Sequence, residues 1–389
     1  MKIESNIWKF YLYRIFQSLT FATPVFVLFL LENGLSLTQI MILQSYYYLI
    51  IVLLGIPSGA FADKFGRKKT IILSSFSLLL GVIAYATGYS FMRFFIAETF
   101  WSLGAALYFG IDSAFLYDTL YELKRKNEYK KVFGTALSFS QIFWGISAFI
   151  GGFIAIKSLR ITWYYTLIPF TIAFFIPFTF KETKIHMSQT NYWLQIKNSV
   201  KFSLSNKKIR YFIVYSSVIS AVWMVAFLMY QPYLKSINLD IKYFGLIYFL
   251  FFLSSAFGSK IAHVFELFFG KKILYLILIV PSLSLILMGF TKSFFGIALI
   301  LIISFTFALS GPILSNYINI NAPSNKRATI NSIQSLAGSL LFVVISPFFG
   351  WIAHKYSVHL FFFFGGMLLL IDLIILFLVN FFNNKNDAV

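Results

Sequence analysis

Four ionisable side chains lie inside long apolar stretches of this sequence, where a charge is costly. They are Arg14, Glu98, Asp112 and Asp372. On insertion scales a charged side chain at the centre of a bilayer costs about 2.5–3.5 kcal/mol, so each of the four needs a partner, a wet cavity or neutralisation. Where one of these groups can reach a group of opposite charge, we predict an ion pair. A group that cannot is a candidate for proton chemistry.

Depth along the predicted helices decides which of these groups can pair. Arg14 lies about 9 Å from the inner end of its helix at 1.5 Å per residue, and Asp112 lies at a similar depth in its own helix. We therefore predict an Arg14–Asp112 ion pair. Glu98, Trp101 and Tyr108 recur at helical spacing with Asp112 and are expected on the same helix face.

Glu98 is expected in the outer half of that helix, opposite Thr23 and Pro24, where the sequence provides no cation. An unpaired acid in a medium of low dielectric favours its neutral form and can exchange a proton near neutral pH. This interpretation makes Glu98 a proton-coupling residue. The alternative is a structural hydrogen bond to a neighbouring helix. For Asp372 we favour a structural role or a position near a helix end.

The composition indicates that lipid surrounds most of the chain. Of the 389 residues, 59% are hydrophobic and only 12% are charged, whereas soluble domains are about half apolar and a quarter charged. Apolar runs of about 20 residues recur, each long enough to cross a hydrocarbon layer of roughly 30 Å. Stretches such as 273–280 lack the alternation of a barrel strand. The fold class we predict is all-α integral membrane, with about twelve transmembrane helices.

One long connection, 181–208, divides these helices into two six-helix bundles, 1–180 and 209–389. The expected spans are 8–31, 38–61, 70–88, 91–116, 132–156, 159–180, 209–234, 240–265, 272–290, 293–317, 328–352 and 357–382. Apolar residues repeat at helical spacing within the connection, which favours a helix in the membrane interface over a solvated linker. These residues are Tyr192, Trp193, Ile196, Val200 and Leu204.

The formal charge of +19 sets orientation and does not require a nucleic-acid partner. Of the 32 Lys and Arg, we expect 24 in cytoplasmic segments and seven outside, with Arg14 inside a helix. This asymmetry follows the positive-inside rule and places both termini in the cytoplasm. The chain has no Cys, which excludes disulfides, thiolate metal sites and thiol catalysis. We expect no metal and no cofactor, and we expect the first apolar run to be retained as a helix.

The loop between the second and third predicted spans carries the most specific pattern. It reads Gly59-Ala-Phe-Ala-Asp63-Lys64-Phe-Gly66-Arg67-Lys68-Lys69. Gly59 permits close helix approach and Gly66 permits a tight turn. The spacing resembles the signature loop of the major facilitator superfamily, which has Gly, three residues, Asp, a basic residue, one residue, Gly, Arg and Lys.

The resemblance implies the fold and the mechanism of that superfamily. Its two bundles rock about a central cavity that opens alternately to each side, and Gly59, Asp63, Lys64, Gly66, Arg67 and Lys68 would belong to the conformational switch. We expect Asp118 to form an ion pair with Arg67, and we expect Arg327 of the second half of the chain to contact Asp63. The equivalent second-half loop, 258–272, has no Asp in register, and the fifth span lacks the Gly-Pro pair of many proton antiporters.

Amides and aromatic residues within the spans suit a bulky amphipathic solute held by stacking and a few hydrogen bonds. The expected cavity residues are Gln17, Gln44, Tyr48, Trp101, Tyr108, Gln141, Trp144, Tyr215, Trp223, Gln231, Asn316, Asn331 and Gln334.

The function these observations favour is secondary active transport of a small organic solute across the cytoplasmic membrane by a monomer. Proton-coupled export of the drug- or siderophore-efflux type is the leading hypothesis, and a proton-coupled importer is the alternative. No phosphate-cradling loop accompanies the helices, so ATP is not an intrinsic energy source. The lack of HExxH and Gly-x-Ser-x-Gly patterns disfavours an intramembrane enzyme. A channel or a non-transporting receptor would differ in gradient dependence or in flux.

Overall fold

The computed structural model describes residues 3–183, 192–323 and 326–386. The described residues form helices and connecting turns, with no strand among them, and this confirms the all-α prediction. Eleven segments are long and apolar enough to cross a membrane. One of them, Lys242–Phe290, contains two successive helices. The described residues therefore contain the twelve crossings that the sequence predicts.

The chain forms two compact units. Unit 1 comprises Met1–Gln189 together with Asp240–Phe249, and unit 2 comprises Thr190–Leu239 together with Leu250–Val389. The division falls near the predicted connection 181–208, except that the first part of one helix of the second half belongs to unit 1. The functional division into bundles 1–180 and 209–389 stays a prediction.

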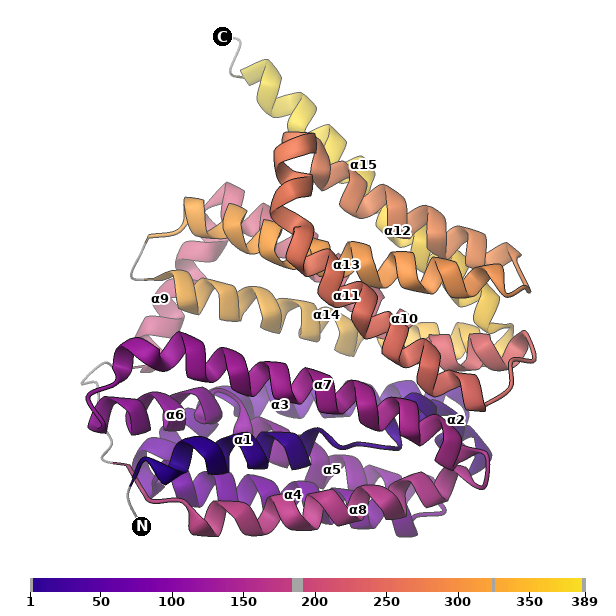
Figure 1. Cartoon of the computed structure of the whole chain (residues 1–389). Coiled ribbons are helices and arrows are strands. Elements are labelled where there is room, and N and C mark those ends of the chain that lie inside the picture. The colour runs from indigo at the N-terminus through magenta and orange to yellow at the C-terminus, as the bar shows by residue number, and fades with distance from the viewer. Residues whose placement is uncertain (1–2, 184–191, 324–325, 387–389) are drawn as a thin grey trace. The chain divides into compact units, whose positions relative to one another are not determined.

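The helices of each unit follow in chain order (Figure 1). Those of unit 1 are α1 (Ser5–Ser18), η1 (Thr23–Val25), α2 (Phe26–Glu32), α3 (Leu37–Phe65), α4 (Arg67–Thr87), α5 (Phe91–Tyr108), α6 (Ile111–Glu122), η2 (Lys126–Glu128), α7 (Tyr129–Ala155), α8 (Leu159–Phe175) and η3 (Ile176–Thr179). Those of unit 2 are α9 (Tyr192–Ser205), α10 (Lys207–Ser236), α11 (Lys242–Phe269, shared with unit 1), η4 (Gly270–Lys272), α12 (Ile273–Phe290), α13 (Phe295–Asn321), α14 (Arg327–Lys355) and α15 (Val358–Asn386).

The first predicted span, 8–31, is broken in the structure. α1 ends at Ser18, and residues 19–22 are not helical before η1 and α2 continue the span. Pro24 lies in the first turn of η1. Proline has no backbone N–H, and its fixed φ suits the first turn of a helix. Pro24 therefore favours a new helix start at η1, a signal that hydropathy alone does not reveal.

Side chains from two other helices satisfy the backbone at this break. The N–H of Thr20 donates to Ser147 Oγ of α7 at 3.2 Å, and the N–H of Phe21 donates to Thr166 Oγ1 of α8 at 3.1 Å. Ser147 Oγ in turn donates to the Ser18 carbonyl at 3.3 Å. Non-helical backbone at membrane depth is tolerated only where such partners exist, so α7 and α8 allow α1 and α2 to be separate helices.

The fourth predicted span, 91–116, is also broken. α5 ends at Tyr108, and α6 begins at Ile111 after Gly110, which has φ +75°. A residue with a Cβ is strained in this left-handed region, whereas glycine adopts it readily. The break gives α6 its own N-terminus within the span, directly before Asp112.

Aromatic rings form much of the core of unit 1, where α4 and α5 run side by side (Figure 1). Tyr85 of α4 stacks on Trp163 of α8 with ring centroids 4.3 Å apart. Phe29 of α2 and Phe94 of α5 meet edge to face at 5.5 Å. Aromatic pairs of this kind contribute about 0.5–1.5 kcal/mol each beyond their buried area, so this cluster fixes α2, α4, α5 and α8 relative to one another.

Candidate functional site

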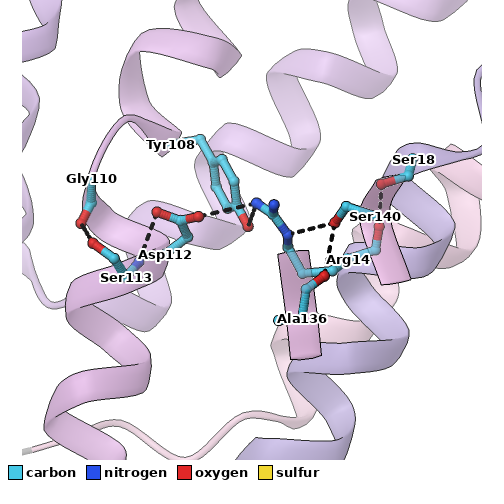
Figure 2. A network of polar contacts seen from close by, with 8 residues as sticks. All are labelled: Arg14, Ser18, Tyr108, Gly110, Asp112, Ser113, Ala136 and Ser140. Atoms are coloured by element: carbon cyan, nitrogen blue, oxygen red, sulfur yellow. Dashed lines mark hydrogen bonds and ion pairs between the residues drawn. The ribbon is translucent and has the colours of Figure 1, made fainter. Parts of the chain in front are cut away.

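Arg14 of α1 joins three other helices of unit 1 through its guanidinium group (Figure 2). Its Nη1 lies 3.0 Å from Asp112 Oδ2 of α6 and 3.2 Å from the hydroxyl of Tyr108, and its Nε donates to Ser140 Oγ of α7 at 2.9 Å. The Arg14 and Asp112 side chains are only 14% and 13% exposed. The structure thus contains the Arg14–Asp112 ion pair that was predicted from the depth of the two residues along their helices.

The break before α6 determines how Asp112 is held. Asp112 lies in the first turn of α6, and its Oδ1 accepts from the N–H of Ser113 at 2.7 Å (Figure 2). The positive end of a helix dipole favours a carboxylate at this position. The anion therefore has two sources of stabilisation, the Arg14 guanidinium and the α6 N-terminus. Sequence reasoning missed the second, although the Gly110 preceding α6 was its signal.

The Arg14 network leaves hydrogen-bonding capacity unused. Its Nη2 makes no hydrogen bond within the residues that the structure describes. Gln17 lies three residues along α1, on the same helix face, and Gln141 lies next to Ser140 on α7. Neither amide has a hydrogen-bond partner in the described part of the chain, and Gln141 is exposed. The Arg14 Nη2 and the amides of Gln17 and Gln141 are therefore polar groups of unit 1 that can donate to and accept from a solute.

Glu98 lies apart from this network, in α5. It is 2% exposed, and its Oε1 accepts from Gln44 Nε2 of α3. Tyr47, Tyr48 and Tyr85 lie close enough to interact with its carboxylate electrostatically. Among the described residues Glu98 makes no ion pair. The hydrogen bond from Gln44 agrees with a structural role for Glu98. The lack of a cation near Glu98 among the described residues agrees with a role in proton coupling.

The loop between α3 and α4 holds Arg67 between two acids. Arg67 Nε lies 2.5 Å from Asp118 Oδ2 of α6, and Arg67 Nη2 lies 3.9 Å from Asp63 Oδ1 at the end of α3. Asp118 is therefore the acid that reaches Arg67, as the sequence pattern predicts. Lys64 is exposed, with its Nζ 5.4 Å from the centroid of the Phe65 ring.

The two glycines of this loop behave differently. Gly66 has φ +99° and separates α3 from α4, as the predicted tight turn requires. A Cβ at Gly59 would meet no atom within 4 Å. The close helix approach expected at Gly59 is therefore not found among the described residues, because that side of α3 is open there.

Glu182 is a partner of this loop that sequence reasoning missed. Its Oε1 accepts from the N–H of Lys68 at 3.1 Å, in the first turn of α4. Asn6 of α1 positions the segment that carries Glu182, since its Nδ2 donates to the Lys181 carbonyl and its Oδ1 accepts from the Lys181 N–H, both at 2.9 Å. The available signal was a lone acid among the lysines that follow the sixth span.

The remaining cavity candidates of unit 1 divide into packed and unsatisfied side chains. Trp101 packs against Phe170 of α8 at 5.4 Å and against Trp163 at 6.2 Å. Trp144 is half-buried on α7, and Tyr48 is half-buried on α3. Trp101 therefore serves the aromatic core, whereas Gln17 and Gln141 keep unsatisfied amides.

In unit 2 three candidates are packed against neighbouring side chains, although Trp223 Nε1 has no hydrogen-bond partner among the described residues. The Tyr215 hydroxyl donates to the Leu274 carbonyl of α12 at 2.5 Å. Trp223 stacks on Phe307 of α13 with centroids 4.1 Å apart, and Gln231 is buried beside the Tyr230 hydroxyl. These side chains are part of the internal packing of unit 2.

The amide candidates of α13 and α14 also differ from one another. Asn331 donates to Asn319 Oδ1 at 2.8 Å and accepts from Ser315 Oγ at 3.3 Å. Asn316 is exposed and Gln334 is half-buried, and neither has a hydrogen-bond partner in the described ranges. Asn316 and Gln334 thus resemble Gln17 and Gln141 in having amide groups available to a solute.

Arg327 and Asp372 are the charged candidates of unit 2. Arg327 begins α14 and its Nε donates to the Ala322 carbonyl at 3.2 Å, while its contact with Asp63 stays a prediction. Asp372 of α15 is 5% exposed, and its Oδ2 has no hydrogen-bond partner in the described residues. Tyr211 and Tyr215 of α10 are near enough to interact with it, which agrees with an intramembrane rather than a helix-end position.

The family model of the Major Facilitator Superfamily matches residues 12–344. The chain belongs to the Major Facilitator Superfamily. It is a multi-pass membrane protein of a transporter family whose members move small molecules, which agrees with the charge network of the α3–α4 loop and with the twelve crossings.

Individual relatives of this superfamily resemble the chain over nearly its whole length. YxaM of Bacillus subtilis (strain 168), described as an uncharacterized MFS-type transporter, is 22% identical over 354 residues that cover 86% of both proteins. The nucleoside transporter NupG has a TM-score of 0.76 at 11% identity, covering 96% of this chain and 98% of its own.

Two further solved structures show the same fold. A bacterial homologue of the human lysosomal transporter Spinster, inward-facing and occupied, has a TM-score of 0.76 at 13% identity and covers 97% of this chain and 96% of its own. A POT family transporter in complex with 5-aminolevulinic acid has a TM-score of 0.72 at 13% identity, with 96% of each chain covered. At these identities the likeness establishes the fold of the superfamily.

Proposed function

We propose that this protein is a proton-coupled exporter of a small amphipathic organic solute. It would work as a monomer in the cytoplasmic membrane, by alternating access, with both termini in the cytoplasm. Coupling to protons and outward direction are the two specific parts of this proposal, and each has its own support and its own test.

The observation that carries proton coupling is the contrast between two buried acids of unit 1. Asp112 has an arginine at 3.0 Å and a helix N-terminus, so its charge is compensated. Glu98 is bonded to the neutral amide of Gln44 and makes no ion pair among the described residues. An uncompensated carboxylate at membrane depth is costly, and uptake of a proton removes that cost. Glu98 would therefore gain and lose a proton as its access to water changes.

The solute class follows from the side chains with unused hydrogen-bonding groups. Gln17 and Gln141 of unit 1, with Asn316 and Gln334 of unit 2, provide neutral donors and acceptors. Arg14 adds the Nη2 donor. Ligand sites of this kind are mostly apolar with a few well-placed polar groups, and 21% of the chain is aromatic. A solute with an apolar body and several polar groups matches the chemistry that these residues offer within each unit.

The switch that would accompany transport is the α3–α4 loop. Arg67 is held by Asp118 and Asp63, and Glu182 binds the first turn of α4. We expect the positive charge of the loop to lie in the cytoplasm by the positive-inside rule. Release of these contacts would free the ends of α3 and α4 to move when the cytoplasmic side opens.

The test is transport by the purified protein in liposomes with an imposed pH gradient, using ethidium and any solute that raises the melting temperature in a thermal-shift screen. Wild type should move solute against its gradient when the proton gradient opposes solute flux. Glu98→Gln should lose this gradient-driven transport and keep solute exchange. The matched control is Glu32→Gln, because Glu32 is an exposed residue at the end of α2.

Gradient-driven transport that survives in Glu98→Gln would reject Glu98 as the proton carrier. Accumulation only in the direction of proton flow would replace export with proton-coupled import. Solute flux that never exceeds equilibration would indicate a channel or a uniporter.

A further inference from the structure

The helix α9, between the sixth and seventh membrane crossings, turns small polar residues inward and apolar residues outward. Ser199 and Ser203 are 0% and 2% exposed, on the side of α9 that packs against α10 and α14. Val200 and Leu204 are 37% and 59% exposed. Since residues four apart share a helix face, Val200 and Leu204 form one apolar strip that no described part of unit 2 covers.

The orientation of this strip is fixed by contacts at the corner between α9 and α10. Asn206 caps α10 by accepting from the N–H groups of Lys208 and Ile209, each at 3.1 Å. Arg210 Nη1 donates to the Leu204 carbonyl at the end of α9, at 3.0 Å. These bonds set the angle of α9 relative to α10. The outward face of α9 therefore has a defined orientation.

Phe202 anchors the opposite side of the helix. It packs on the cluster formed by Ile209, Ile318 and Ile330, and its ring lies 4.8 Å from Lys326 Nζ. α9 is therefore held to unit 2 by Phe202 as well as by the buried serines.

Cations accompany the apolar strip without acids to neutralise them. Lys197, Lys201, Lys207, Lys208 and Arg210 are all exposed. The sequence contains no Asp or Glu between Glu182 and Asp240, and none of the five forms an ion pair within the described residues. Three of them lie in the first turn of α10, where the helix dipole disfavours cations. The surface formed by α9 and the first turn of α10 is therefore positively charged, and anions from outside the chain would neutralise it.

We propose that α9 and the first turn of α10 bind anionic phospholipid headgroups. Val200 and Leu204 enter the boundary between headgroups and acyl chains, and the lysines beside them contact lipid phosphates. An exposed apolar strip flanked by cations is the arrangement of helices that lie in a membrane interface, and a cluster of cations next to a transmembrane helix recognises anionic lipid. The positive-inside rule accounts for the cations alone, but it does not account for exposed Val200 and Leu204.

This proposal rests on the membrane-embedded fold and on no part of the proton-coupling proposal. Anionic phospholipid would be a ligand of the connection between the two halves of the chain, separate from the transported solute. Lipid bound there would stabilise the position of α9 and, through Arg210 and Asn206, the start of α10. Failure of proton coupling would leave the lipid proposal intact, and the reverse also holds.

The absence of cysteine makes a site-specific test possible. A fluorophore is attached to Leu204→Cys, and to Asn198→Cys as the reference on an exposed position of another helix face. Each protein is reconstituted in phosphatidylcholine vesicles containing brominated phosphatidylglycerol or brominated phosphatidylcholine, and quenching of the fluorophore is compared. The label at 204 should be quenched more strongly than the label at 198, and more strongly by the anionic lipid.

The lysines are tested by Lys197→Gln with Lys201→Gln, against the matched pair Lys271→Gln with Lys272→Gln, which are exposed lysines of η4. The local enrichment of phosphatidylglycerol at position 204 should fall about fivefold for each lysine removed from α9. It should not change in the η4 pair. High salt should reduce the enrichment in the otherwise wild-type protein, which keeps the proposal testable should the double variant fail to fold.

Three results would overturn the proposal. Equal quenching of the 204 label by the two lipids would exclude anionic selectivity. Quenching at 204 no stronger than at 198 would show that the apolar strip does not enter the membrane, as expected of a surface for a protein partner. An equal loss of enrichment in both lysine pairs would reduce the effect to overall charge.

Discussion

Removing the Asp112 carboxylate while leaving Arg14 in place should destabilise unit 1 more than removing both charges. At 3.0 Å the attraction between the two charges is about 5.5 kcal/mol with an effective dielectric constant of 20. Desolvation of two buried ions offsets most of that gain. The pair therefore adds little net stability, yet loss of one member leaves the other charge buried and uncompensated.

The substitutions follow the geometry of the site. Asp112→Asn keeps an oxygen that can accept from the Ser113 N–H, so it removes the charge and retains the cap of α6. The cost should be about 3–5 kcal/mol, as for other buried pairs that lose one partner. Arg14→Gln with Asp112→Asn should cost clearly less than the sum of the two single variants. A coupling of about 2 kcal/mol or more is expected for charges in direct contact.

The assay is the free energy of unfolding of the four proteins in detergent, measured as a double-mutant cycle. Solute binding to each variant is measured alongside, because we propose that Arg14 Nη2 donates to the solute. Single-variant costs that simply add would refute the reasoning, since they would mean that Arg14 does not depend on Asp112 in the folded protein.

Further predictions concern the backbone breaks and the α3–α4 loop. Gly66→Ala should cost about 1 kcal/mol or more in unfolding free energy, because φ is +99° and the new Cβ would lie 2.9 Å from Glu182 Oε2. Glu182→Gln should be milder, since an amide oxygen can still accept from the Lys68 N–H, and protease sensitivity of the loop would report it. Thr166→Val should cost about 1–3 kcal/mol by leaving the Phe21 N–H of the α1–α2 break unsatisfied. Ser147→Ala should cost less, because the Thr20 N–H also donates to the Ser18 carbonyl at 3.0 Å. Thermal unfolding of each variant, with Thr171→Val as an exposed control on α8, would check these values, and equal costs for Thr166→Val and Thr171→Val would contradict the account of the break.

The extent of the membrane spans was predictable because hydropathy depends on composition over about 20 residues. The Arg67–Asp118 contact was also predictable, since the spacing of the loop resembles a known signature. The Arg14–Asp112 pair followed from helical rise, because both residues lie in regular helix for the turns that set their depth. The helix at 192–204 was visible as a periodic pattern, and α9 spans Tyr192–Ser205.

The break within the first span was not predictable in the same way, whereas Gly110 was a local signal of the break within the fourth. A break is stable only if distant side chains satisfy the backbone, and Ser147 and Thr166 lie more than a hundred residues from Thr20 and Phe21. The place of Glu182 on α4 depends equally on a contact across 114 residues. Amide residues that look alike in sequence also separate only in three dimensions, where Asn331 is satisfied by Asn319 and Gln17 is not.

Proton movement during solute transport tests the central claim most directly. The wild-type protein is reconstituted in liposomes that enclose a pH-sensitive dye, and solute is added outside the liposomes without an imposed pH gradient. Proton-coupled export predicts that solute entering the vesicles drives protons out, so the lumen becomes alkaline, and that Glu98→Gln moves solute with no change in dye signal. Solute transport by the wild type without any change in lumenal pH would contradict the account.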